Sequence, residues 1–420
     1  MGGAPASPLA ASSAETKNNS ERYQMKKQLL GTTALVAAGL FVLADAGPAS
    51  AQQKVEPIKV SVGGYVGAFV SIVDQDDVGN TAAGRDGELA LIDTHTDQEI
   101  HFNGRTTLAN GITIGFRIEL EGNTEGDQID ESYLFLESSF GRVEIGQVNN
   151  VHYRMAYKAP DVFTRGWVNE GNFTNVMVNP TGSPNGDSTI NTTVSRFRDN
   201  DSDKINIYTP RFAGFQIGAS YVPDSSQDTA APTSVSAAYS EGWAVAANYV
   251  QTFGEFSVAA YAGYFKWQGP QTAPGVSAPD PDHWSVGLQL GYAGFRVGGS
   301  YGQISDGRTG AAGTAGASAA GTGGNITDGM AWDVGVSYTF GPASVSLTYM
   351  QAENDDSPVG GPALGDDEFS IVSLAAKYVL GPGISWDTAL FWAEFEGNTA
   401  GTNVDDNEAI GLVTGFVLVF

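Results

Sequence analysis

Apolar and polar residues alternate along most of the chain after residue 54, which is the pattern of β-strands with one apolar face. From Ile112 to Glu121, isoleucine, phenylalanine and leucine occupy one face, and threonine, glycine, arginine and glutamate the other. Segments 215–221, 284–292 and 332–340 repeat the pattern, and several carry aromatic residues at their ends. Such aromatic ends are typical of membrane barrels, whose girdles lie at the two bilayer interfaces. The alternation therefore predicts an all-β protein with a lipid-facing surface.

The connections between these segments are of two kinds, short turns such as Asn110-Gly111 and Gly341-Pro342, and long polar stretches such as 74–96 and 305–329. If each kind lies on its own side of a membrane, the two must alternate along the chain. This requires segments 234–239 and 243–249 to be one strand with an irregularity at Glu241-Gly242. The strand count is then sixteen, and the prediction is a transmembrane 16-stranded antiparallel β-barrel with an aqueous lumen.

The last strand alternates up to the carboxyl terminus, with Ile410, Leu412, Phe416, Leu418 and Phe420 on one face. A chain that ends in an aromatic residue after alternate apolar ones resembles the recognition signal of the outer-membrane barrel-assembly machinery. We therefore predict this role for Phe416, Leu418 and Phe420. The same alternation turns the three valines at 413, 417 and 419 toward the lumen, where apolar residues are unexpected.

The N-terminal region carries an export signal. Met25-Lys26-Lys27 begins a positive segment, an apolar run follows from Leu29 to Leu43, and Ala49 and Ala51 are the small residues that a signal peptidase reads. We predict a mis-assigned extension over residues 1–24, a signal peptide over 25–51 that is cleaved after Ala51, and a single barrel domain over 52–420. An uncleaved anchor ahead of a soluble domain is the alternative.

Composition narrows the functional classes. The formal net charge of -26 argues against nucleic acid as a partner. The absence of cysteine excludes a disulfide scaffold, a thiol nucleophile and cysteine-ligated metals. The four histidines show no metal-ligand spacing, and the chain has no GxSxG nucleophile motif. We therefore expect no enzymatic activity.

Several segments together resemble Gram-negative trimeric porins of the alphaproteobacterial type. These are Gly104-Arg105, Gly111 to Glu119, Phe140 to Gln147, Tyr208 to Phe215 and the terminal Phe420. The resemblance covers residues 60–420. It implies a homotrimer in the outer membrane, in contact with lipid and lipopolysaccharide, that passes small hydrophilic solutes and ions by passive diffusion. It also implies that the third long loop folds into the barrel and narrows it.

The third long connection, about residues 150–201, is the longest, and its first half carries apolar residues that could pack against a wall. Alternation places Arg105, Arg117 and Arg142 on lumen-facing positions. In porins of this family, basic residues line one wall and the inserted loop supplies carboxylates, which gives a transverse field. By this resemblance we expect the three arginines to form the basic wall, and Asp161 and Glu170 to be the loop carboxylates.

Some alternatives stay open. A substrate-selective channel of the same fold would share these features, and a secreted, glycine-rich β-sandwich adhesin would also show alternation. No cofactor is expected, but acidic clusters at 74–77, 353–356, 366–368 and 405–406 could bind calcium at the exterior. Cation or anion preference does not follow from the net charge, because selectivity belongs to the narrowest part of a channel.

Overall fold

A computed structural model describes residues 56–76, 89–122, 128–164, 168–178, 202–225, 239–273, 276–305, 328–355, 366–396 and 406–420. The chain divides into two compact units, and the first consists of residues 1–55 and 108–112. Of this unit the structure describes only a turn, in which the Gly111 N–H donates to the Leu108 carbonyl over 2.9 Å. The expected extension and signal peptide lie outside the described residues.

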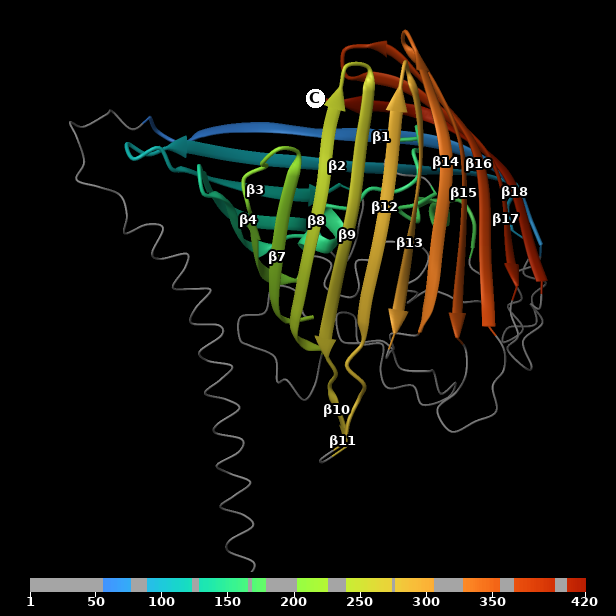
Figure 1. Cartoon of the computed structure of the whole chain (residues 1–420). Helices are drawn as coiled ribbons and strands as arrows, with labels where there is room; N and C mark the ends of the chain where they lie inside the picture. Colours follow the sequence, from blue (N-terminus) through green and yellow to red (C-terminus); the bar gives the residue numbers. More distant parts are fainter. Residues whose placement is uncertain are drawn as a thin grey trace, which may run out of the picture. The chain divides into compact units, whose positions relative to one another are not determined.

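The second unit is a β-barrel (Figure 1). The described residues contain eighteen strands. Sixteen of them close the barrel: β1 (Lys59–Gln75), β2 (Ile92–Thr107), β3 (Thr113–Glu121), β4 (Ile129–Ser138), β5 (Gly141–Gln147), β6 (Asp203–Tyr208), β7 (Phe215–Asp224), β8 (Ser240–Phe253), β9 (Phe256–Gln268), β12 (Asp282–Tyr292), β13 (Phe295–Ser305), β14 (Gly329–Phe340), β15 (Ala343–Asp355), β16 (Asp366–Gly381), β17 (Ile384–Glu396) and β18 (Asp406–Val419). Two short strands, β10 (Gln271–Ala273) and β11 (Val276–Ser277), form a separate hairpin in one long connection.

Each barrel strand pairs antiparallel with its neighbours in the chain, and β18 closes the ring against β1. The final residue takes part in the closure, because Phe420 and Gly64 exchange two backbone hydrogen bonds of 3.0 and 3.1 Å. The sixteen-stranded antiparallel barrel is therefore confirmed, and the β-sandwich alternative is wrong. Within the described residues, we find no helix with the length and apolar character of a membrane span.

The irregularity expected at Glu241-Gly242 is present. The register between β8 and β9 shifts between Ser240 and Trp243. Glu241 has a φ of 50°, a left-handed conformation that L-residues other than glycine, asparagine and aspartate rarely adopt. A β-bulge of this kind lets one strand continue through a break in alternation. The rule that long and short connections alternate thus located a real bulge.

The two faces of the strands differ as the alternation predicts. On β12, Trp284, Val286 and Leu288 are exposed on the outer face, whereas His283 and Ser285 are buried on the inner face. At the C-terminal end, Phe416 and Leu418 of β18 and the following Phe420 are exposed to 53%, 46% and 62%. The barrel therefore presents an apolar outer surface, which suits lipid.

Candidate channel and its inserted loop

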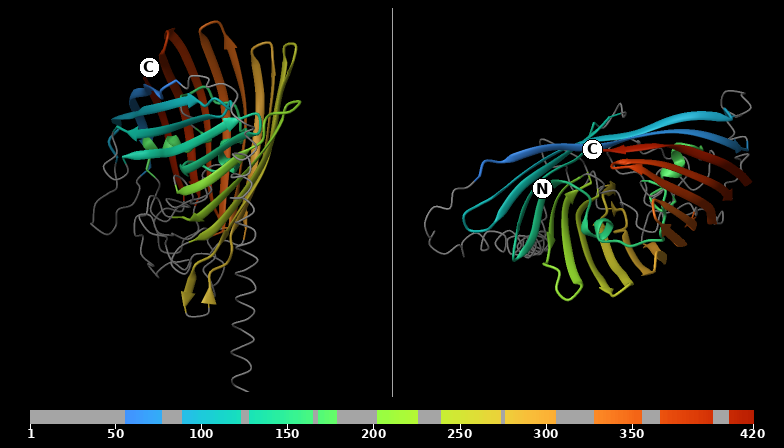
Figure 2. Two further views of the ribbon diagram at one scale, coloured as in Figure 1. Left: turned by 90° about the vertical axis from the view of Figure 1, so that its left-hand side faces the viewer. Right: turned by 90° about the horizontal axis from the view of Figure 1, so that it is seen from above.

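The described parts of the connection between β5 and β6 lie inside the ring of strands, as the view from above in Figure 2 shows. These parts, residues 148–164 and 168–178, include the helical turn α2 (Val151–Arg154) and the 3-10 turn η2 (Asn172–Asn175). Asn150 begins α2, and its side chain accepts from the Tyr153 N–H over 3.0 Å. The rest of the expected loop, residues 165–167 and 179–201, lies outside the described residues.

Polar side chains on the inner wall bind the backbone of this loop one after another. The Val151 N–H donates to Ser220 Oγ over 2.9 Å, near the start of the loop. The Ala159 N–H donates to Asp333 Oδ1 over 2.9 Å, half-way round the wall. The wall residues that make such bonds come from β7, β8, β9, β12, β14, β15, β17 and β1, and are Ser220, Asn248, Tyr261, Gln289, Asp333, Ser346, Thr348, Asp387 and Gln75. The loop is thus attached along most of the inner wall.

Apolar contacts reinforce the attachment. Phe163, Val168, Phe173 and Met177 of the loop are buried in a cluster with wall residues of β1, β15, β16, β17 and β18. Val413 and Val417 of β18 belong to this cluster and are 0% and 2% exposed. The inward valines that the sequence left unexplained therefore pack under the loop. Val419, at the end of the strand, is 59% exposed.

Wall glycines give the loop backbone room to approach. A Cβ atom on Gly287 of β12 would lie 1.8 Å from the Tyr157 carbonyl oxygen. A Cβ on Gly335 of β14 would lie 3.1 Å from the Pro160 carbonyl oxygen. Any side chain at Gly287 would therefore displace the loop.

The three expected wall arginines lie on the lumen side of β2, β3 and β5, and their surroundings differ. The Arg117 Nε donates to Glu119 on the same strand, in a close contact. Arg142 bonds to Glu144 over 2.7 Å and to Glu137 over 3.0 Å. Arg105 is exposed, and among the described residues it has no ion pair. Two of the three arginines are thus partly neutralised by carboxylates of their own wall.

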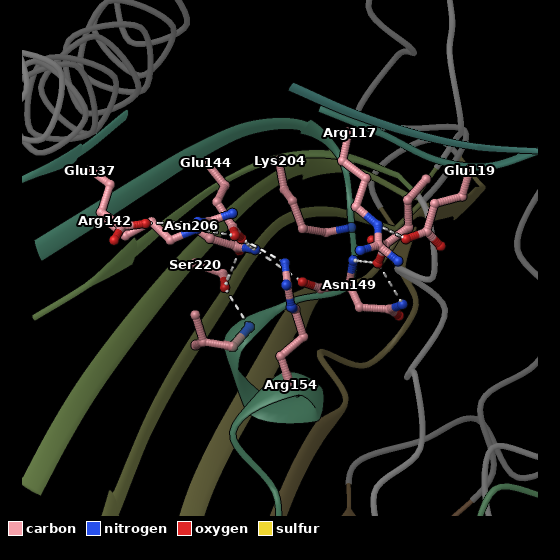
Figure 3. A network of polar contacts seen from close by, with 12 residues as sticks. Arg117, Glu119, Glu137, Arg142, Glu144, Asn149, Arg154, Lys204, Asn206 and Ser220 are labelled. Carbon is pink, nitrogen blue, oxygen red and sulfur yellow. Dashed lines mark hydrogen bonds and ion pairs between the residues drawn. The ribbon is translucent and has the colours of Figure 1, made fainter. Parts of the chain in front are cut away.

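The loop contributes a cation to the same wall. Arg154 of α2 reaches Glu144 Oε2 over 2.7 Å, so Glu144, itself 1% exposed, is shared by two guanidinium groups (Figure 3). Asn206 also donates to Glu144, and Ser220 connects Asn206 to the N-terminus of α2. Burial opposes the charge of Arg154, but Tyr208 and the carboxylates of Glu144 and Glu131 raise its pKa, so it stays charged.

The two expected loop carboxylates are engaged within the loop. Asp161 accepts from the N–H groups of Phe163 and Val168, both over 3.0 Å. Burial raises the pKa of Asp161 to about 6 against the lowering effect of these bonds. Glu170 accepts from Lys158 Nζ over 2.6 Å and from the Tyr153 hydroxyl over 2.5 Å. Neither carboxylate is paired with the three wall arginines by a contact of the described residues.

A cavity of about 660 Å³ lies between the loop and the wall. Loop residues Lys158, Asp161 and Glu170 line one side, and Gln289 and Arg296 of the wall line another. Burial opposes the charge of Lys158, yet Glu170 and Tyr153 raise its pKa, so Lys158 stays charged beside Glu170. The lumen beside the loop is therefore lined by fixed charges of both signs.

Charges on β2 and β3 change sign along the strands. The register sets Glu99 opposite Glu121, and His101 opposite Glu119. Arg105 lies six residues after Glu99 on β2, close to the short turn, and opposite Lys59 of β1. Sequence reasoning missed this acidic end of the wall, although the alternation of residues 95–101 places Asp97 and Glu99 on the lumen side with Arg105.

Comparisons with known proteins give one family and one fold. The family model described as Gram-negative porin matches residues 31–398. No curated protein matches the chain in sequence. Among solved structures, an anion-selective porin from Comamonas acidovorans is 18% identical, with a TM-score of 0.55, covering 87% of this chain and 100% of its own. OmpT of Vibrio cholerae in its trimer form (12%, TM-score 0.54, 87% and 100%) and the outer-membrane channel DcaP of Acinetobacter baumannii (12%, 0.54, 89% and 100%) are similar to the same extent.

Proposed function

Because the chain belongs to the Gram-negative porin family, we propose that its channel is a general diffusion pore whose free cross-section is set by the inserted loop. The observation that carries this is the row of wall side chains that hold the loop backbone inside the barrel. An outer-membrane porin passes small hydrophilic solutes and ions passively, and a loop fixed across the lumen sets their size limit. No step of such transport requires catalysis.

Within this proposal, Arg105, Arg117 and Arg142 act as the basic side of the passage, and Asp161 and Glu170 as the acidic side. The contacts of Asp161 and Glu170 support different roles for the two carboxylates. Asp161 holds the loop backbone, because both its oxygens accept loop N–H groups. Glu170 forms an ion pair with Lys158 next to the cavity. Arg105 is the member of the basic set that acts on solutes most directly, since it is exposed.

We further propose a homotrimer in contact with lipopolysaccharide, assembled by the barrel-assembly machinery through Phe416, Leu418 and Phe420. The outward, exposed position of these three side chains is compatible with recognition before membrane insertion. Calcium at the exterior acidic clusters stays a proposal, and those clusters lie partly outside the described residues.

The test is single-channel conductance of the detergent-purified, refolded protein in a planar lipid bilayer. Large steps that close in three equal decrements are expected for an open trimer. Absence of conductance from protein that is demonstrably folded, by heat-modifiable electrophoretic mobility, would refute the diffusion pore. Arg105→Gln should alter ion permeation broadly, whereas loss of one solute class alone would indicate a substrate-selective channel.

A further inference from the structure

Two carboxylates and one imidazole converge on the lumen side of β2 and β3. Glu99 and His101 are alternate residues of β2, and Glu119 lies opposite His101 on β3. Oxygen or nitrogen atoms of the three side chains lie within 4.8 Å of one another. Glu99 and Glu119 are 3% and 6% exposed, whereas the His101 side chain is 16% exposed, so the cluster can be reached from the lumen.

The hydrogen bonds define the state of His101. Arg117 Nη2 lies 3.3 Å from His101 Nδ1, and a guanidinium can only donate, so Nδ1 is the accepting nitrogen. The other nitrogen, Nε2, then carries the proton and donates to Glu99 Oε2 over 2.7 Å. Glu99 Oε1 in turn accepts from the Tyr65 hydroxyl over 2.7 Å. A histidine that donates one N–H to a carboxylate while its other nitrogen is available is the usual arrangement of a metal ligand.

A positive group of the protein already bonds to the ligand atoms. The Arg117 guanidinium contacts both Glu119 and His101 Nδ1, so lone pairs of these two side chains converge on a position that holds a cation. The Arg117 side chain is 34% exposed and lies on a long flexible stem, so it can leave toward the water of the lumen. A small ion of higher charge could then take its place.

We propose that His101 and Glu119 bind a divalent transition-metal cation from the channel water, with Glu99 orienting the imidazole through its Nε2–H and Arg117 as the group that the metal displaces. His101 Nδ1 and Glu119 are the two ligand groups that Arg117 now contacts, and water from the lumen would complete the coordination. The nitrogen ligand favours Zn²⁺ and similar ions over Mg²⁺ and Ca²⁺, which prefer oxygen. The neighbouring group of Glu99, Glu121 and Asp130 offers only oxygens and is not included.

The test is calorimetric titration of the folded, detergent-purified chain with Zn²⁺, followed by the same titration in the presence of Mg²⁺. One saturable Zn²⁺ site per chain is expected. His101→Gln and Glu119→Gln should each weaken it at least tenfold, because each removes a ligand and loss of an outer-shell partner alone usually costs about tenfold. Arg117→Gln should strengthen it, because the competing cation is gone. His95→Gln is the matched control: His95 lies on the same strand, stacked on Phe69 at 5.0 Å, and should leave Zn²⁺ affinity unchanged.

Four results would overturn the proposal: no Zn²⁺ site in the unaltered chain, a site that appears only in Arg117→Gln, a site that survives both His101→Gln and Glu119→Gln, or Mg²⁺ competing as an equal. Heat-modifiable mobility of each variant shows whether the barrel is folded. The measurement does not depend on conductance, so its failure and failure of the proposed pore are distinguishable.

Discussion

Replacing Gly287 by alanine should release the inserted loop while leaving the barrel intact. The added Cβ would lie 1.8 Å from the Tyr157 carbonyl oxygen, and ordinary contact begins near 3.4 Å, so the loop backbone must retreat by about 1.6 Å. Such a shift breaks the adjacent bonds from Gln289 to the Lys158 carbonyl, now 2.6 Å, and from the Ala159 N–H to Asp333, now 2.9 Å. At roughly 1 kcal/mol for the first and about 2 kcal/mol for the bond to a carboxylate, the loop loses about 3 kcal/mol of attachment.

The assay is limited trypsin digestion at Arg154 and Lys158 in the loop, combined with single-channel conductance. Gly287→Ala should be cut faster and should show noisier or altered conductance, with unchanged heat-modifiable mobility because the strand ladder is untouched. Gly381→Ala is the control, since a Cβ at Gly381 meets no atom within 4 Å. If Gly287→Ala behaved like Gly381→Ala, the loop would not lie against β12 as described. Barrel unfolding at a lower temperature would show that loop and wall unfold as one unit.

Two further changes test the charged groups that hold the loop. Asp161 has a folded pKa of about 6, above its usual value near 3.8, so its unfolded form releases a proton more readily and loop attachment should weaken as pH rises from about 4 to 6. Asp161→Asn should abolish that pH dependence of protease protection, and an unchanged profile would contradict it. Glu144→Gln should weaken the loop by about 2 kcal/mol, because two guanidiniums lose a buried partner. Glu137→Gln, which alters a 54% exposed carboxylate, should change unfolding by less than about 1 kcal/mol in the same thermal assay.

The barrel was predictable because its information is local. Period-two alternation assigns each residue to a face without knowledge of its neighbours in space, and the alternation of long and short connections corrected the count at Glu241-Gly242. The position of the loop inside the barrel also followed from the sequence. Apolar residues in a long connection, such as Phe163 and Phe173, need a surface to pack on. Val413 and Val417, which face the lumen, form part of the wall surface on which these loop residues pack, and the sequence analysis did not connect the two.

The partners of the charges were not predictable, because they depend on competition within a few ångströms. Asp161 was assigned to the passage, yet two backbone N–H groups of the same loop occupy its oxygens. Glu170 meets Lys158 of its own loop. Nothing in the strand pattern singles out Arg154 of the loop, and its contact with Glu144 depends on how α2 packs against the wall. Strand periodicity specifies the face of the sheet on which a side chain lies, but not which neighbouring groups that side chain contacts.

The charges of β2 add an axial component to the transverse field expected from the resemblance. On β2, acidic Asp97 and Glu99 lie toward the long connection and Arg105 lies toward the short turn, about 20 Å from Glu99 at the rise of a strand. Charges of opposite sign in series along a channel make current depend on the direction of flow, whereas charges facing each other across it do not. The Debye length of about 30 Å at 0.01 M salt exceeds this separation, and that of about 3 Å at 1 M does not. Current through the pore should therefore rectify at low salt and become symmetric at high salt. Arg105→Gln should reduce the rectification, and a symmetric current at 0.01 M would show that the passage is governed by charges that face each other across the lumen.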